Sequence, residues 1–421
     1  MKLAIVGAGW AGLACAVHAT RAGQQVSLFE AARMAGGRAR RIEDHHAPGL
    51  ALDNGQHILI GAYSATLALM REVGVDPSQA LLRTPLCMRF ADGGGLALPR
   101  LPAPLDLVAG ILTARGWTWR DKASLLGTAT RWRLAGFRCA PSVSVADLCA
   151  TLTPRIMAEL IEPLCVSALN TSVRQSSGQV FLRVMHDALF AERGGADLLL
   201  PRVDLGALLP DAATQWLAQR GASLHIGTRV NTIESHAGAW QVNGEAFDRV
   251  VLACAPWDAA RLVRATGVDA GNWLASTEAL RYEAIATTYV TGARRRLAAP
   301  MVALRSGPGA PAQFVFDRAQ LGGPAGLLAF VVSANETPRE ALQQQVIAQA
   351  AAQLGEHALQ PLQTVVEKRA TFACTPGLRR PPSSIAAGLA ACGDYVDGPY
   401  PATLEGAIRS GVAAALHPGE G

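Results

Sequence analysis

No two of the eight cysteines stand in C-x-x-C spacing, and they are spread widely along the chain. A zinc site or a C-x-x-C redox site is therefore not indicated, and buried, reduced thiols of a cytosolic protein are the simpler interpretation. Internal repeats and low-complexity segments are also missing. Charged residues make up only 17% and hydrophobic residues 50% of the 421 residues, which excludes a disordered chain and allows two or three domain-sized units.

Long hydrophobic runs are absent too. No run of eighteen apolar residues is free of charge and proline, so a membrane-spanning helix is not expected. The apolar N-terminus looks like a signal peptide, but its three glycines at the fixed spacing of a known motif argue against one. The net charge of +5 is scattered and aromatics amount to only 5%, so we expect no nucleic-acid partner. The same charge suits an anionic lipid surface, and we expect a cytoplasmic protein peripherally attached to the inner face of the cytoplasmic membrane.

The first thirty residues follow a strand–helix–strand pattern, KLAIVGAGWAGLACAVHATRAGQQVSLFE. Residues 2–6 predict a short buried strand, and residues 11–21 predict a helix of small side chains that ends at Gly23. Residues 25–29 predict a second strand, parallel to the first because a helix connects the two.

Three glycines lie between the first strand and the helix in G-x-G-x-x-G spacing. Gly7 permits the tight turn, Gly9 lets the backbone approach a pyrophosphate, and Gly12 lets the helix pack against the strand. Glu30 follows at the end of the second strand, where it would accept a hydrogen bond from a ribose hydroxyl. A generic glycine-rich turn would leave Glu30 unexplained, so the pattern predicts dinucleotide binding.

The residues after Glu30 decide between NAD and FAD. The stretch AARMAGGRAR contains Gly36, Gly37 and Arg38, and such a second glycine pair resembles the flavoprotein amine oxidases and the carotenoid-type desaturases. The resemblance implies FAD, with this stretch beside the pyrophosphate and Arg38 near it. Taken alone, Arg38 would be read as an exposed charge.

The C-terminal stretch LAACGDYVDGPYPATLEGAIRSG resembles the second FAD motif of the same families. An apolar strand ends at Gly393 and Asp394, which the resemblance places against the pyrophosphate and the ribityl chain. A proline-rich loop leads to a predicted helix that begins at Leu404, with Thr403 as its N-cap. Its N-terminal N–H groups would face the flavin pyrimidine ring. Both ends of the chain are thus expected to meet on one FAD, although a terminal helix can also be ordinary packing.

The middle of the chain contains further pieces of the same architecture. Residues 204–221 predict one amphipathic helix, and several strands follow, around His225 and over residues 230–233, 240–242 and 249–254. The resemblance implies that the backbone of Val230 contacts the adenine.

The predicted fold class is α/β: a Rossmann-type FAD-binding domain of the GR2 type, a parallel sheet plus a β-meander, with an inserted α+β substrate domain. We expect the FAD-binding domain to comprise residues 1–83, 193–256 and 383–421, and the substrate-binding domain residues 84–192 and 257–382.

A cluster of polar residues, DNGQH, interrupts two strand-like runs at Asp53 to His57. In flavoproteins of this build the chain passes the isoalloxazine ring here, and Gly55 would allow a close approach to FAD. Gln56 and His57 would then present polar groups to the reacting carbon. A plain hairpin turn at Asp53-Asn54-Gly55 is the alternative.

The whole chain resembles the squalene-associated FAD-dependent desaturase family, most specifically in LDNGQHILIGAY and in LPAPLDLVAGILTARGWTWRDKASLL. The resemblance implies reductive dehydroxylation of hydroxysqualene to squalene in hopanoid biosynthesis, with hydride from reduced FAD. The leaving hydroxyl needs a proton. His57 and Asp53 are the first candidates for the general acid, together with Gln56 as the catalytic set; Tyr395, Tyr400 or water are further possibilities.

The partners follow from this resemblance. We expect an apolar C30 isoprenoid substrate and an external electron donor, because a second Rossmann motif for NAD(P)H is not visible; nor is a metal site. One segment allows two interpretations: LPAPLDLVAGILTARGWTWRDKASLLG, which contains Arg115, Arg120 and Lys122. It either lies in a membrane interface or forms an ordinary core-facing helix pair.

Alternative functions remain open on the sequence. A polyene desaturase or isomerase of the phytoene type would use the same scaffold. An amine oxidase is disfavoured by the five tyrosines, since amine sites are commonly bracketed by aromatics. A non-catalytic FAD-dependent membrane factor that binds isoprenoids, and an NAD-binding structural protein, are the alternatives from other classes.

Overall fold

The computed structural model of the protein describes residues 1–43, 50–102, 104–191, 194–236 and 238–416. The expected boundary at residues 192–193 and the end of the chain from 417 therefore lie outside the described residues, and the predicted division into domains stays a prediction.

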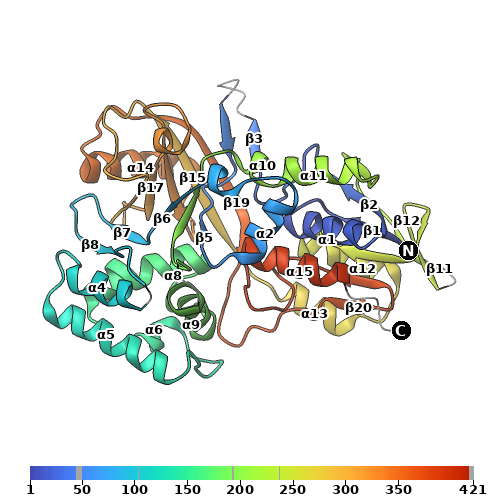
Figure 1. Cartoon of the computed structure of the whole chain (residues 1–421), viewed down its shortest axis with the longest axis horizontal. Helices are drawn as coiled ribbons and strands as arrows, with labels where there is room; N and C mark the ends of the chain where they lie inside the picture. Colours follow the sequence, from blue (N-terminus) through green and yellow to red (C-terminus); the bar gives the residue numbers. More distant parts are fainter. Residues whose placement is uncertain (44–49, 103, 192–193, 237, 417–421) are drawn as a thin grey trace.

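A six-stranded sheet occupies one end of the molecule (Figure 1), in the order β10-β2-β1-β14-β21-β20. Its strands are β1 (Lys2–Val6), β2 (Gln25–Glu30), β10 (Ser223–Ile226), β14 (Arg249–Leu252), β20 (Ser384–Ala386) and β21 (Leu389–Ala391). β1 is central and pairs in parallel with β2 and β14, and only β20 is antiparallel to its neighbour. The near-continuous apolar sequences of β1 and β14 fit strands that are covered on both faces.

Helices from both ends of the chain cover one face of this sheet. They are α1 (Trp10–Arg21), α2 (Ser64–Glu72), α10 (Leu205–Leu208), α11 (Pro210–Gln219) and α15 (Leu404–Leu416). α1 and α15 pack so closely that a Cβ on Gly411 would lie 2.1 Å from the carbonyl oxygen of Ala11. The first helix and the last therefore form one layer, as Figure 1 shows.

The other face carries the β-meander β11 (Ile233–His236), β12 (Ala239–Val242) and β13 (Glu245–Phe247), with α12 (Pro256–Thr266) and α13 (Gly271–Glu278). The hairpin between β12 and β13 turns at Asn243 and Gly244, whose φ angles of 48° and 86° fit the type I′ turn expected for Asn-Gly. Val230 precedes the meander, because β11 begins at Ile233 and not at residue 230.

The single helix predicted for residues 204–221 is two helices. Leu209 interrupts it with φ −152° and ψ −54°, and Pro210 starts α11 at its first position. The ring of Pro210 removes the N–H that would continue α10, which explains the break. The helical periodicity of the sequence was correct, and the interruption was missed.

A second, five-stranded antiparallel sheet lies at the other end, in the order β16-β17-β18-β15-β19. Its elements are β15 (Tyr282–Thr291), β16 (Met301–Ala303), β17 (Phe314–Asp317), the 3₁₀ helix η3 (Arg318–Leu321), β18 (Leu328–Ser333), α14 (Arg339–Leu354) and β19 (Gln360–Phe372). In Figure 1, β15 and β19 reach from this sheet towards the six-stranded one.

Short strands and a helical region complete the fold. The strands are β3 (Arg41–Glu43), β4 (Ala51–Asp53), β5 (Leu59–Ile60), β6 (Leu81–Thr84), β7 (Cys87–Arg89), β8 (Gly95–Ala97) and β9 (Leu198–Pro201). The helices are α3 (Pro77–Ala80), α4 (Leu105–Thr113), α5 (Trp119–Leu134), α6 (Val145–Leu148), α7 (Pro154–Ile156), the π-helix η1 (Met157–Ile161), α8 (Glu162–Leu169), α9 (Gly178–His186) and the π-helix η2 (Asp187–Ala191). α4 to α6 lie at the end of the molecule remote from the six-stranded sheet (Figure 1).

Candidate active site

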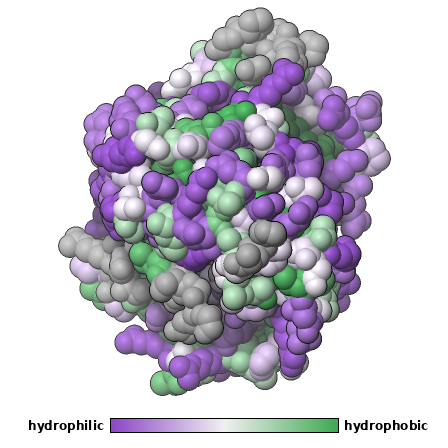
Figure 2. All heavy atoms as spheres, turned by 90° about the vertical axis from the view of Figure 1, so that its right-hand side faces the viewer, coloured by the Kyte–Doolittle hydropathy of each residue, from purple (hydrophilic) through white to green (hydrophobic). Residues whose placement is uncertain are grey.

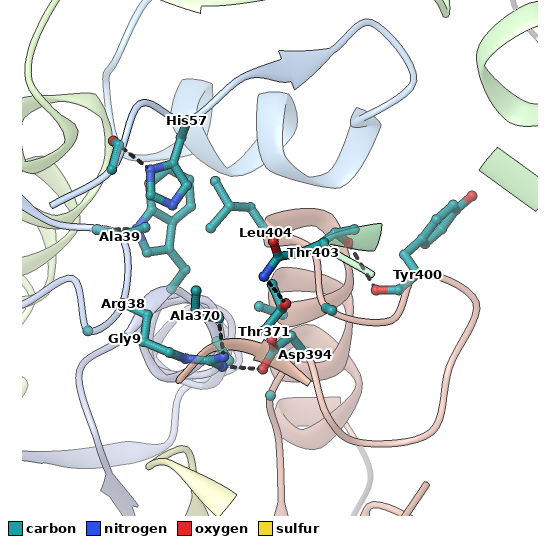
Figure 3. A pocket seen from close by; sticks show the side chains of 18 of the residues that line it. Gly9, Arg38, Ala39, His57, Ala370, Thr371, Asp394, Tyr400, Thr403 and Leu404 are labelled. Atoms are coloured by element: carbon teal, nitrogen blue, oxygen red, sulfur yellow. Dashed lines mark hydrogen bonds and ion pairs between the residues drawn. The ribbon is translucent and has the colours of Figure 1, made fainter. Parts of the chain in front are cut away.

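A cavity of about 590 Å³ connects the six-stranded sheet with the five-stranded sheet. Eleven of the twelve residues that the sequence assigned to the cofactor line it: Gly7, Gly9, Glu30, Gly36, Gly37, Arg38, Gly55, Val230, Gly393, Asp394 and Leu404. Gly12 is the exception. The two ends of the chain therefore meet at one site, and Figure 3 shows Gly9, Arg38, Asp394 and Leu404 around it.

The three glycines of the first turn differ in what surrounds them. A Cβ on Gly7 would lie 2.7 Å from the carbonyl oxygen of Ala253, and one on Gly12 would lie 1.9 Å from that of Gly7. Both positions are closed by protein backbone. A Cβ on Gly9 would meet only the Cα of Gly37, at 3.9 Å, and Gly9 has an ordinary φ of −70°. Gly9 thus borders open space that a ligand can fill.

The second glycine pair runs alongside the first turn. The backbone N–H of Gly36 donates to the carbonyl oxygen of Ala8 at 2.8 Å, and Gly9 and Gly36 form an isolated parallel bridge. α1 begins after Gly9 with no side chain capping its N–H groups. Such a helix N-terminus favours an anion.

Arg38 and Asp394 join the two ends of the chain by an ion pair. Arg38 also donates to the carbonyl oxygen of Ala370 at 2.9 Å (Figure 3). Burial opposes the charged form of Arg38, but Asp394 more than offsets this and raises the pKa of the guanidinium. The pair holds Asp394 in place at the cavity wall.

Glu30 stands at the end of β2 and also lines the cavity. Its Oε2 accepts from the N–H of Ala8 at 2.7 Å, and its Oε1 accepts from the N–H of Ala32 at 2.8 Å. These bonds fix the carboxylate beside the glycine-rich turn, where the motif requires it.

The start of α15 is organised by two side chains. Oγ1 of Thr403 accepts from the N–H of Gly406 at 2.9 Å and donates to the carbonyl oxygen of Tyr400, as Figure 3 shows for the latter. Glu405 is fully buried, and its carboxylate accepts from the N–H groups of Ala65 and Thr66 at the start of α2. Leu404, the first helical residue, faces the cavity.

Asp53 does not line the cavity, in contrast to the catalytic role expected for it. Its Oδ1 accepts from the N–H of Leu205 at 2.8 Å, at the start of α10, and its backbone exchanges hydrogen bonds with the hydroxyl of Tyr289. Asp53 is the last residue of β4, whereas Asn54, the next residue along the chain, lines the cavity. Asp53 is a buried carboxyl group that fixes this segment, and the catalytic role expected for it stays a prediction.

The buried Asp53 predicts a specific dependence of stability on pH. Burial raises its pKa to about 7, although the N–H of Leu205 opposes this. Between about pH 4 and 7 the folded protein keeps a proton that the unfolded chain has lost, so this contribution to stability falls as the pH rises. Asp53→Asn still accepts from Leu205, and we expect it to stabilise the fold at pH 8 but not at pH 4.5, measured by urea unfolding.

Asp269→Asn, in an exposed loop, is the matched control and should show no such difference between the two pH values. An equal effect of Asp53→Asn at pH 4.5 and pH 8 would contradict the assigned protonation.

His57 lines the cavity, with Nδ1 at 3.0 Å from the carbonyl oxygen of Gly55 (Figure 3). Since that oxygen can only accept, Nδ1 carries the proton and Nε2 has a free lone pair. Burial lowers the pKa of His57, and the nearby charge of Arg38 adds to this, against the hydrogen bond to Gly55. The neutral ring is thus suited to accept a hydrogen bond at pH 7, whereas the sequence suggested a general acid.

Gln56 also lines the cavity, and its Oε1 accepts from Nη1 of Arg318 at 3.0 Å. Both side chains are buried. Sequence reasoning missed Arg318, because it lies in η3, directly after β17 of the five-stranded sheet, and no local pattern marks it. The bond ties the DNGQH segment to that sheet.

The part of the cavity beyond the glycines is lined mainly by apolar side chains. They come from β5, the segment before β7, β9, β16 and β17, as Ile60, Leu86, Leu198, Met301, Phe314 and Phe316. α8 and α9 add Leu164 and Val184. The sequence predicted an apolar binding region for the substrate, but it did not identify these lining residues, since they are far apart in the sequence.

Comparison with known proteins supports a flavin as the cofactor. The family described as flavin containing amine oxidoreductase matches residues 10–416. Hydroxysqualene dehydroxylase of Rhodopseudomonas palustris is 29% identical over 446 aligned residues, covering 98% of this chain and 96% of that protein.

Two further similarities are less complete or less close. A probable zeta-carotene desaturase of Synechococcus elongatus is 28% identical over 277 residues, which cover 59% of this chain and 56% of that protein. The solved structure of cyclohexylamine oxidase from Brevibacterium oxydans has a TM-score of 0.69 and 16% identity, with 98% of this chain and 97% of that chain covered. This last similarity bears on the fold alone, and it agrees with the α/β class expected from the sequence.

Proposed function

The chain belongs to the family of flavin containing amine oxidoreductases, and we propose that it converts hydroxysqualene to squalene. The observation that carries this proposal is the cavity. Its glycine-rich part, where both ends of the chain meet, is continuous with the apolar arm, and residues Asn54 to His57 line it. The similarity to hydroxysqualene dehydroxylase over nearly the whole chain supports the same substrate.

The residues present fit FAD. Gly9 borders open space, the uncapped start of α1 offers N–H groups to a pyrophosphate, and Glu30 is fixed where a ribose would lie. Gly393 is held against α15, because its N–H donates to Oγ of Ser410 at 3.1 Å. We propose that these residues, with Gly36, Gly37, Arg38, Val230, Asp394 and Leu404, hold the cofactor.

When bound, reduced FAD would supply a hydride and would itself be oxidised. In the overall reaction the allylic C–O bond is replaced by a C–H bond, and the hydroxyl leaves as water after taking up one proton. The chain's own residues arrange this chemistry. The apolar arm binds the hydrocarbon and excludes water from an electron-deficient carbon. Nε2 of His57 accepts the hydrogen bond of the substrate hydroxyl and so orients its oxygen. Among the candidate proton donors, Tyr395 and Tyr400 line the cavity, in contrast to Asp53.

Removing the imidazole tests this orientation. We expect His57→Ala to raise the KM for hydroxysqualene about tenfold, because one hydrogen bond to the hydroxyl is lost. The flavin content should stay unchanged, since His57 is not among the residues that hold FAD. Steady-state kinetics with absorbance at the flavin band measure both. Unchanged kinetics would remove His57 from the site chemistry.

The proposed reaction itself is tested with anaerobic, photoreduced protein and hydroxysqualene. Reoxidation of the flavin together with formation of squalene supports dehydroxylation. A purified yellow protein that gives no squalene under these conditions contradicts it and favours a non-catalytic isoprenoid-binding factor.

A polyene desaturase is the second candidate, and the partial similarity to a zeta-carotene desaturase favours it. The oxidised protein would then introduce a double bond into an isoprenoid hydrocarbon. Anaerobic incubation of the oxidised protein with phytoene-type polyenes, followed by product analysis, distinguishes the two reactions.

We also propose an external electron donor, since the sequence holds one glycine-rich dinucleotide motif.

Within the described part of the chain, no helix has both the length and the apolar character needed to cross a membrane. We propose peripheral contact with an anionic bilayer through α4. Leu105, Val108 and Leu112 lie on one face of α4 and are 58%, 38% and 42% exposed, and Trp119 nearby is 75% exposed.

Basic groups accompany this apolar face, as a lipid surface requires. Arg115 and Arg120 are exposed, and Lys122 donates to the carbonyl oxygen of Leu112 at 2.7 Å while it lies over the ring of Trp119. By contrast, hydrophilic side chains cover much of the opposite end of the molecule, and apolar ones are scattered among them (Figure 2).

We expect the triple variant Leu105→Ser, Val108→Ser and Leu112→Ser to bind vesicles of phosphatidylglycerol and phosphatidylcholine at least tenfold more weakly. Each exposed side chain that enters the acyl region contributes about 1 kcal/mol or more. Vesicle sedimentation measures the loss. Ile226→Ser, an exposed apolar residue at the other end, is the control and should bind as wild type. Equal binding by the triple variant would exclude α4 as the contact.

A further inference from the structure

A second, smaller cavity of about 200 Å³ lies next to the apolar arm. Its own lining comes from the segment between β6 and β7, from Leu98 and Leu200, and from Ala299 and Pro300 before β16. The wall of this cavity is mostly apolar, and among the described residues that line it none is charged. An apolar cavity of about 150 Å³ is enough to bind benzene, so this one has room for a short hydrocarbon segment.

The two cavities share one wall. Leu86, Leu198 and Met301 line both of them. Met301 is opposite Phe316 in the β16–β17 pair, and Phe316 lines the main cavity. A methionine side chain is flexible and polarizable, so it can move aside for a chain that passes from one cavity to the other.

The second cavity also lies under α4. A Cβ on Gly110 of α4 would be only 2.7 Å from Cδ2 of Leu98, so the helix rests directly on this lining residue. The outer side of the same helix carries the exposed Leu105, Val108 and Leu112. The small cavity is thus situated between the apolar arm and the apolar helix face.

We propose that the small cavity is a subsite for one end of the isoprenoid chain, with Leu86, Leu198 and Met301 as the constriction that the chain crosses. This inference rests on the proposed function, because it assumes a substrate long enough to extend from the flavin past Met301. We expect a thirty-carbon chain whose hydroxyl lies at His57 to extend to the subsite, and a ten-carbon alcohol to stay within the main cavity. The occupant is the terminal hydrocarbon of the substrate itself.

Cys87 provides a direct readout, because it lines the small cavity and is partly exposed. The holoenzyme is treated with N-ethylmaleimide in detergent micelles, with squalene, with geraniol or with neither, and the modified cysteines are quantified by mass spectrometry. We expect squalene to slow alkylation of Cys87 at least fivefold and geraniol to leave it unchanged. Cys139, equally half-buried but outside both cavities, is the internal reference.

A pair of neighbouring variants gives a second, independent readout. Ala299→Phe fills the small cavity, and Ala298→Phe places the same ring on the exposed adjacent residue. We expect Ala299→Phe to weaken squalene binding at least tenfold and to leave geraniol binding unchanged. Binding is measured by the change that each ligand causes in the flavin absorption spectrum. Ala298→Phe should bind both as wild type does.

The inference is overturned if squalene fails to protect Cys87, if geraniol protects it equally, or if Ala299→Phe and Ala298→Phe bind squalene alike. Conversion of hydroxysqualene by the wild-type protein is measured in the same preparation. A protein that makes squalene but shows none of these effects has the proposed function without the subsite, and a protein that shows them without making squalene has the subsite but not the function.

Discussion

Gly9→Ala should give a folded protein that takes up almost no FAD. Gly9 has φ −70°, which alanine adopts without strain, and the added methyl group would meet no protein atom closer than 3.9 Å. The methyl group instead occupies the space in which a pyrophosphate must approach the backbone and the start of α1. We expect the affinity for FAD to fall on the order of 100-fold, equivalent to about 2.7 kcal/mol.

The measurement is FAD titration of the apoprotein by fluorescence quenching, alongside thermal unfolding without FAD. Gly127→Ala is the matched control, because Gly127 lies in α5 with no atom within 4 Å of the added carbon and does not line the cavity. Gly127→Ala should bind FAD as wild type does. If Gly9→Ala also retained full affinity, the first glycine-rich turn would not be the pyrophosphate site.

Glu405→Ala should destabilise the fold severely. The carboxylate of Glu405 is fully buried and accepts from the backbone N–H groups of Ala65 and Thr66, from the hydroxyl of Thr66 at 2.7 Å, and from Nε of Arg409 at 2.7 Å. Alanine leaves the N-terminal N–H groups of α2 and the Arg409 guanidinium without this partner. We expect a loss of about 3–5 kcal/mol in the free energy of unfolding.

Urea unfolding of the apoprotein measures this loss separately from FAD binding. Glu278→Ala is the control, because Glu278 forms an ion pair with Arg264 while its side chain is 48% exposed, and such a pair contributes about 1 kcal/mol or less. A similar small loss for Glu405→Ala would mean that α2 and α15 are not held together by this carboxylate.

The parts of the fold that the sequence predicted well are those with strong local signals. The strand, turn and helix around Gly7, Gly9 and Gly12 follow from spacing alone, and so does the helix from Leu404, with its Thr403 cap and its small residues. Each signal lies within a few residues of the structure that it specifies. The resemblance then brought the two motifs to one cofactor, which spacing by itself would not have done.

Other features depended on information that no short segment contains. Asn54 lines the cavity and the adjacent Asp53 does not, and the composition of the DNGQH segment does not distinguish the two. The hydrogen bond from Arg318 to Gln56 joins η3 to the loop between β4 and β5, 262 residues earlier in the chain. The apolar arm draws on strands and helices from across the chain. These contacts arise only after both sheets have formed.

The close packing of Gly411 on Ala11 has a consequence for how the holoprotein is made. The α1 surface that receives α15 is translated almost four hundred residues before its partner. While the ribosome is still elongating the chain, the nascent N-terminal half exposes the apolar face of α1 and only part of the dinucleotide site. Vitamin B2 loading is therefore expected to be a post-translational event, because the part of the site that α15 contributes, beginning at Leu404, is translated last.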